Sequence, residues 1–116
     1  MYDENNIFAK IIRGEIPCDK VYEDDNCLFF YDINPLAKIH VLAIPKTSNV
    51  DFSDFISKND PGVVSDFFKK IHLVIEILGI QSDGYRLVAN SGINGGQEVP
   101  HFHIHILGGG RINKKI

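Results

Sequence analysis

Three of the chain's five histidines fall within seven residues, alternating with apolar side chains over His101–Leu107. Strict alternation is the period of a half-buried strand. The pattern predicts that Phe102, Ile104 and Ile106 face a core and that the histidines line the other face. Alternate side chains on a strand are about 6.6 Å apart. A small anionic group over the middle ring, His103, could therefore contact both neighbouring rings.

The middle imidazole could act as a nucleophile toward phosphorus. With an ordinary pKa of about 6.5, histidine is largely neutral at pH 7, and one ring nitrogen then carries a free lone pair. Attack on phosphorus would give a covalent phosphohistidine that water then cleaves. His101 and His105 could donate to phosphate oxygens or pass a proton to the leaving group. The row therefore predicts a phosphate site in which His103 attacks.

A metal site is the alternative interpretation of the same row. His101 and His105 would lie about 13 Å apart along a strand, whereas zinc forms bonds of about 2.0–2.1 Å to histidine nitrogens in a tetrahedral arrangement. At most two of the three rings could share one ion, with help from residues elsewhere. Zinc binding stays open as an alternative, whereas the nucleophile interpretation requires no metal and no cofactor.

The motif around these histidines resembles that of the histidine triad, or HIT, family. His-x-His-x-His is followed by two apolar residues, and the preceding Gly95–Val99 and following Gly108-Gly109 are similar to the family's Hint branch, the nucleoside phosphoramidate hydrolases. The similarity extends from about Asn6 to Arg111. Branches with a structural zinc carry a cysteine pair where this chain has Asn5-Asn6-Ile7-Phe8, so that zinc is not expected.

The resemblance implies hydrolysis of purine nucleoside 5′-phosphoramidates, of the AMP–amine type, through a nucleotidyl-histidine intermediate on His103. It also implies a homodimer in which the sheets of two subunits join. Other functions stay open: a dinucleoside polyphosphate hydrolase or nucleotidyl transferase of the same family, or a module that binds purine nucleotides without turnover.

The resemblance also implies roles for individual residues. His105 and His40 would bind phosphate oxygens or assist the leaving group, and His101 would orient its neighbours. Asp32 would hold the ribose hydroxyls, although an acid at the end of a strand also commonly forms a turn. In the phosphate pocket the matches are Asn90, Gly96 and Gln97, and in the adjoining loop they are Glu98 and Val99. In the purine pocket the matches are Ile7, Phe8, Ile11, Ile16, Phe30 and Ile33. For the apolar residues at 7, 8, 11 and 16, plain core packing is an equal alternative.

Glu98 departs from the Hint pattern, which commonly has serine at this position. An ionised glutamate 4 Å from a phosphate would repel it by roughly 4 kcal/mol at an effective dielectric constant near 20. Three outcomes are open: Glu98 turns away from the site, it has a raised pKa and acts as an acid, or it favours a cationic or amine-bearing leaving group.

The elements that must position these residues follow from apolar periodicity. A short helix over 7–12 is predicted after the caps Asn5 and Asn6. The clearest helix runs from Pro61 to Leu78, with Asp60 as its cap and glycine after it. Strands are predicted over 21–23, 27–31, 40–46, 85–90 and 101–107, whereas 47–57 is ambiguous. The fold class is therefore α+β, with an antiparallel sheet of about five strands and two helices.

Composition limits the remaining possibilities. A chain of 116 residues fits a single domain, 1–116. Its formal net charge of −3, without a basic block, does not suggest binding to nucleic acid. We find no bilayer-spanning run and no signal-like segment, so we expect no membrane association and a cytoplasmic location. Cys18 and Cys27 are expected to be reduced thiols.

Overall fold

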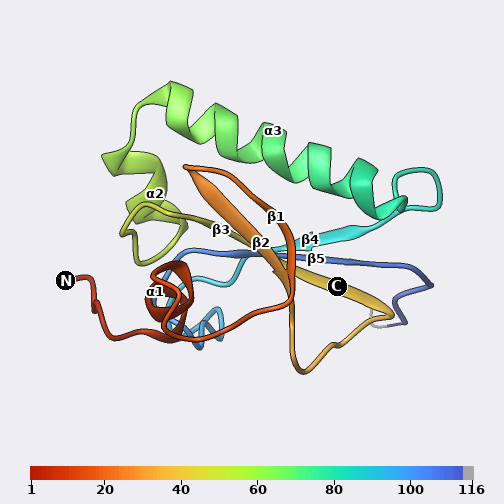
Figure 1. The fold of residues 1–116 in the computed structure, drawn as a ribbon, viewed down its shortest axis with the longest axis horizontal. Helices are drawn as coiled ribbons and strands as arrows, with labels where there is room; N and C mark the ends of the chain where they lie inside the picture. Colours follow the sequence, from red (N-terminus) through yellow and green to blue (C-terminus); the bar gives the residue numbers. More distant parts are fainter. Residues whose placement is uncertain (114–116) are drawn as a thin grey trace.

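A five-stranded antiparallel sheet forms the middle layer of the structure, a computed structural model that describes residues 1–113 (Figure 1). Its strands are β1 (Lys20–Glu23), β2 (Cys27–Tyr31), β3 (Ile39–Pro45), β4 (Arg86–Val88) and β5 (Ile104–Gly108), in the spatial order β1-β2-β3-β5-β4. Every neighbouring pair is antiparallel. The predicted α+β class and number of strands are therefore confirmed.

Helices cover both faces of this sheet. The long α3 (Pro61–Leu78) runs along one face, and α1 (Ile7–Ile12) lies on the other (Figure 1). The larger core lies under α3 and includes Phe29, Phe67 and Phe102. A smaller cluster, with Phe8 and Phe30 among its members, lies under α1. The α1 face also carries the predicted site, because His40, Leu42 and His105 point to it.

The two predicted helices are present. Asn6 caps α1 by accepting the Ala9 N–H at 2.9 Å. Pro61 begins α3, and Gly79 ends it in the left-handed conformation (φ +69°), which glycine adopts without a Cβ penalty. In contrast to the two helices predicted, the structure has a third, α2 (Phe52–Lys58), which begins in the segment left ambiguous and ends one residue beyond it.

The register of β5 confirms the predicted alternation and corrects the strand boundary. Phe102, Ile104 and Ile106 are buried in the core under α3. The strand begins at Ile104 rather than at His101, because the Phe102 N–H donates to the Asn49 carbonyl at 2.8 Å instead of to a neighbouring strand. Strand β4 is likewise shorter than the predicted 85–90.

The two cysteines are unpaired, and burial raises the pKa of the Cys27 thiol to about 12. Of the helices in residues 1–113, none has both the length and the apolar character needed to cross a bilayer.

Candidate active site

A cavity of about 370 Å³ opens on the α1 face of the sheet and collects residues from distant parts of the chain. Its volume falls within the range of small-ligand pockets, about 300–1,000 Å³. The lining residues are Phe8, Asp32, Asn34, Leu36, His40, Leu42, Asn90, Gly96, Glu98, Val99, His103 and His105. Nine of these twelve were among the predicted site residues.

The hydrogen bond that His103 makes assigns its tautomer. Its Nδ1 lies 2.7 Å from the His101 carbonyl oxygen, which can only accept, so Nδ1 carries the proton. The lone pair of the neutral ring is therefore on Nε2. The Phe8 ring packs edge-on against the His103 ring, with centroids 4.9 Å apart, and His103 is 6% exposed. The middle histidine thus has a fixed orientation and an unprotonated nitrogen.

His40 and His105 form a second hydrogen-bonded unit. The Leu36 N–H donates to His40 Nδ1 at 3.1 Å, so the proton of the neutral His40 ring is on Nε2. That Nε2–H donates to His105 Nδ1 at 2.9 Å. The proton of a neutral His105 is therefore on its own Nε2. This pair presents a donor beside the His103 lone pair, because the His103 and His105 rings lie 5.0 Å apart.

His101 lies behind the cavity rather than in its lining. Its fully buried ring donates from Nε2 to the Pro45 carbonyl at 2.8 Å. Its Nδ1 accepts the Tyr2 hydroxyl proton at 2.6 Å. These bonds hold the backbone carbonyl that accepts from His103. Tyr2 was missed by the sequence interpretation, because it precedes every periodic segment and no motif includes it.

Burial keeps these four histidines neutral. Desolvation lowers the pKa of His101 to about 4. Desolvation, with repulsion from His103 and His40, lowers the pKa of His105 to about 4. The pKa values of His40 and His103 are lowered mainly by burial, and nearby carboxylates partly oppose the fall. All four rings are therefore uncharged at pH 7, as the assigned tautomers require.

We expect the free energy of unfolding to fall as the pH drops from 6.5 toward 4. In this window the unfolded rings bind protons at their ordinary pKa of about 6.5, whereas His101 and His105 in the folded protein do not. Each pKa unit of difference costs about 1.4 kcal/mol per group. Urea unfolding at pH 7 and at pH 5 measures the loss. Equal free energies at the two pH values would contradict the buried, neutral histidines.

Asp32 both forms a turn and lines the cavity. Its Oδ1 accepts the Asn34 N–H at 2.8 Å, and its Oδ2 lies 3.5 Å from His40 Nε2. The turn places Asn34 and Leu36 in the lining, two residues that the sequence interpretation missed. The two interpretations weighed for Asp32 are thus compatible.

The loop before β5 is held by its own polar side chains. Asn90 donates to the Gly95 carbonyl at 2.7 Å. Gln97 donates to the carbonyls of Val50 and Val99 and accepts the Gly92 N–H, so its side chain braces the loop and does not line the cavity. A Cβ at Gly95 would overlap the Ser91 carbonyl oxygen, so the tight loop requires glycine there.

Only some of the residues matched to a purine pocket line the cavity. Of these residues Phe8 lines the cavity, as does Val99 from the adjoining loop. Phe30 is buried against Phe8, with ring centroids 5.8 Å apart, and Ile11 packs on the same cluster. Outside the lining, Ile16 is partly buried, whereas Ile7 and Ile33 are 45% and 88% exposed.

One group of potential metal ligands occurs in residues 1–113: Asp32, His40 and His105. The assigned tautomers do not suit a metal, because His40 Nε2 carries a proton and His105 Nδ1 accepts it. Binding an ion there would require His40 to lose the bond from the Leu36 N–H, or to become an imidazolate.

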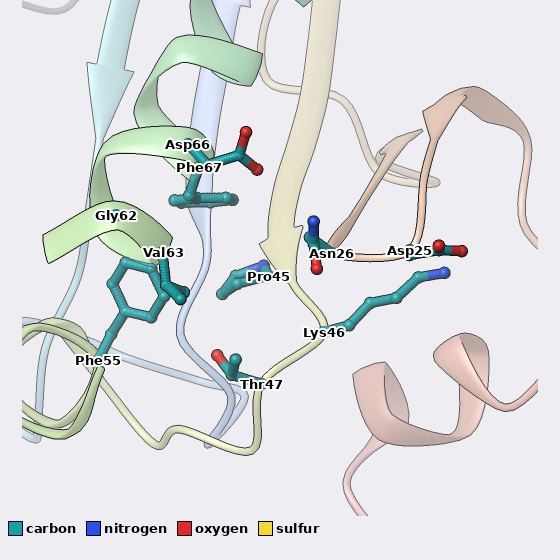
Figure 2. Close-up of a pocket in the computed structure, with 10 residues that line it drawn as sticks. All are labelled: Asp25, Asn26, Pro45, Lys46, Thr47, Phe55, Gly62, Val63, Asp66 and Phe67. Atoms are coloured by element: carbon teal, nitrogen blue, oxygen red, sulfur yellow. The ribbon is translucent and has the colours of Figure 1, made fainter. Parts of the chain in front are cut away.

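A second cavity, also of about 370 Å³, lies between the N-terminal half of α3 and the end of β3 (Figure 2). Phe55, Val63 and Phe67 form its apolar side, and Asp25 and Lys46 lie across from them. Its lining has no histidine or cysteine. It therefore lacks the nucleophile that the first cavity contains.

Comparisons with known proteins find relatives of this chain both in sequence and in structure. The HIT domain family model matches residues 13–112. An uncharacterized HIT-like protein of Helicobacter pylori is 50% identical over 104 residues, which cover 90% of this chain and 96% of that protein. A histidine triad protein of Clostridium difficile has a similar structure (TM-score 0.89, 40% identity, all of both chains covered). So does a HIT family hydrolase of Clostridium thermocellum (TM-score 0.85, 39% identity, 98% of each chain covered).

Proposed function

The chain belongs to the HIT family, and we propose that it hydrolyses purine nucleoside 5′-phosphoramidates, with AMP–amine compounds as substrates. A structural relative, from Clostridium thermocellum, is described as a HIT family hydrolase, which supports hydrolysis as the reaction type. That the bond cleaved is a phosphorus–nitrogen bond is proposed from the positions of the protons on the histidines of the site.

The observation that carries the proposal is the distribution of protons over the histidines. His103 presents a lone pair on Nε2, because its Nδ1–H is bonded to the His101 carbonyl. His105 presents an Nε2–H, because its Nδ1 accepts from His40. Nucleophile and acid thus lie side by side, each with one ring nitrogen held by the protein. Nucleophilic displacement of a poor leaving group requires this combination.

In the first step, His103 Nε2 attacks phosphorus and the phosphorus–nitrogen bond breaks. The leaving nitrogen takes the proton from His105 Nε2 and departs as a neutral amine. This transfer leaves the His105 ring anionic beside the positively charged, nucleotidylated ring of His103 until the second step. Positive charge that develops on the attacking imidazole is stabilised by its Nδ1–H, which donates to the His101 carbonyl. The product of this step is a nucleotidyl-histidine.

In the second step, water attacks the phosphorus of the nucleotidyl-histidine. The water's proton returns to His105 Nε2, the bond to His103 Nε2 breaks, and the nucleoside monophosphate leaves. In the resting site His40 holds His105 in the tautomer with its proton on Nε2, because the Leu36 N–H fixes Nδ1 of His40. These residues form the complete proton cycle.

The rest of the cavity fits a nucleoside. Phe8, Leu42 and Val99 offer apolar surface against which a purine ring could pack. The Asp32 carboxylate lies 3.5 Å from His40 Nε2 and would accept the ribose hydroxyls with the oxygen that the Asn34 turn does not use. Asn90 and Gly96, on the loop across the cavity, complete the proposed phosphate pocket.

The test is the release of AMP from an adenosine 5′-phosphoramidate. The reaction contains a chelator, and chromatography detects the AMP. We expect the native protein to release AMP without added metal. A folded protein whose melting temperature rises with AMP but which releases none would contradict the proposal and favour a binding module.

We further propose a homodimer in which the β4 edges of two sheets meet. Leu87 is 43% exposed on this edge strand, and Phe68, Leu73 and Ile77 expose apolar surface on α3. An unpaired strand edge and exposed apolar side chains both favour contact with a second copy of the chain. Sedimentation should give the mass of two chains, and Leu87→Lys should shift it toward one. A native protein that sediments as a single chain would contradict the dimer.

A further inference from the structure

We propose that Glu98 makes this site selective for phosphoramidates whose leaving amine carries a second, positively charged group, such as diamines and basic amino acids. The inference rests on the proposed hydrolysis and adds the class of leaving group. It follows from where the structure places Glu98 and from the charges that surround it.

Glu98 lies in the lining of the cavity rather than turned away from it. It is an exposed residue on the loop that leads into the histidines. Its charge reaches the nucleophile, because Glu98 is one of two carboxylates that oppose the fall in the His103 pKa produced by burial. Of the three outcomes that the sequence left open for Glu98, these two observations support an orientation toward the site.

The fixed charge of the cavity is negative. Its lining contains two carboxylates, Asp32 and Glu98, and no lysine or arginine. The four histidines of the site are neutral at pH 7, so they do not balance these charges. A phosphate site without a basic side chain is unfavourable for a nucleotide that brings further negative charge. A substrate in which a cationic group offsets the phosphate charge suits it better.

The two carboxylates are not equivalent. Asp32 accepts the Asn34 N–H and lies 3.5 Å from His40, so it is held in place. Within the described residues, Glu98 has no ion-pair partner. With Asp32 assigned to the ribose, Glu98 is the carboxylate left for the leaving group. An ammonium group on the leaving amine would provide its missing partner.

The same charges bear on the competing substrate class. A dinucleoside polyphosphate brings additional phosphate charges into the cavity, and Glu98 would repel them. A phosphoramidate of a diamine carries one phosphate charge and one ammonium charge, which cancel. The cavity's electrostatics therefore favour the phosphoramidate over the polyphosphate, independently of how the histidines act.

The experiment compares three adenosine 5′-phosphoramidates of similar length that differ in the charge at the far end of the amine. The amines are 1,5-diaminopentane (positive), pentylamine (neutral) and 5-aminopentanoate (negative). We expect kcat/KM of the native protein at low salt to fall in that order, by about five- to tenfold between the positive and neutral compounds. Added salt should shrink the difference, because the carboxylate is exposed and screening is strong there.

Glu98→Gln removes the charge and keeps the shape. We expect it to reduce the preference between the positive and neutral compounds to about twofold or less. Asp25→Asn is the matched control, since Asp25 is also an exposed acid but lines the other cavity (Figure 2). It should retain the native order.

Equal kcat/KM for all three compounds in the native protein would overturn the inference and leave the hydrolase proposal standing. A preference that persists in Glu98→Gln would also overturn it. If none of the three compounds is hydrolysed, the proposed function itself fails, and the inference fails with it.

Discussion

Replacing His103 with alanine should lower the rate of AMP release from an adenosine 5′-phosphoramidate by about 10⁴-fold or more, the size of loss seen when a nucleophile is removed. None of the other three histidines of the site can take over the attack. His105 presents a proton rather than a lone pair, and both nitrogens of His101 are used within the protein. The variant should still bind AMP, because the ribose and purine contacts proposed here lie elsewhere in the cavity.

The measurement is AMP release by native and variant protein under the same conditions, together with melting temperatures with and without AMP. His72→Ala is the matched control, because His72 is exposed on α3 and pairs with Glu76 at 3.3 Å, outside the cavity. It should keep native activity. Rapid AMP release by a folded His103→Ala protein would eliminate a nucleotidyl-histidine on this residue. A quench with denaturant at alkaline pH should conversely trap the nucleotide on the protein, because acid would cleave the phosphorus–nitrogen bond of a nucleotidyl-histidine.

The long-range framework of the site was predictable from the sequence because its signals are periodic. Alternation over His101–Leu107 predicted which side chains face the core, and the stripe from Pro61 to Leu78 predicted α3. Those two elements decide which face of the sheet stays available for the histidines. Cap residues at each end of α3 added independent support, since proline begins it and glycine ends it.

The proton arrangement was not predictable, because it depends on contacts between residues far apart in the chain. The tautomer of His105 follows from His40, 65 residues earlier, and the position of His101 depends on Tyr2, 99 residues away. Gln97 shows the same limit. Its side chain matches a phosphate donor in sequence, but it bonds to backbone groups of the loop and to the Val50 carbonyl, 47 residues earlier in the chain.

Helix α2 escaped prediction for a local reason. It has seven residues, which is too short for a clear apolar stripe, and Phe55 is its one buried side chain. Its first turn is formed by Asp51, which accepts the Asp54 N–H at 2.9 Å. Tertiary packing of Phe55 rather than helix propensity therefore determines this element. Phe55 also packs directly against Phe102, which lies between the first two histidines of the triad.

That residue, Phe102, should give the largest loss of stability among single substitutions near the site. It is 2% exposed, and its ring stacks on Phe55 with centroids 4.9 Å apart and an interplanar angle of 25°. Phe67 contacts it edge-on at 5.8 Å. Phe102→Ala should lower the free energy of unfolding by about 3–5 kcal/mol, through lost transfer energy and the cavity left behind. That is a large share of the roughly 5–15 kcal/mol typical of a domain.

Urea unfolding measures this loss, and Phe52→Ala is the comparison, since Phe52 is 43% exposed and also contacts Phe102. Removing the exposed ring should cost less than half as much.

Phe102 also connects packing to chemistry, because it lies between His101 and His103 and its N–H donates to the Asn49 carbonyl. The cavity left by Phe102→Ala would loosen the His101 carbonyl, which accepts the His103 Nδ1–H. AMP release should therefore fall, although Phe102 contacts no substrate. A loss below about 1 kcal/mol would mean that the core under α3 closes over the gap, contrary to the close packing of three aromatic rings.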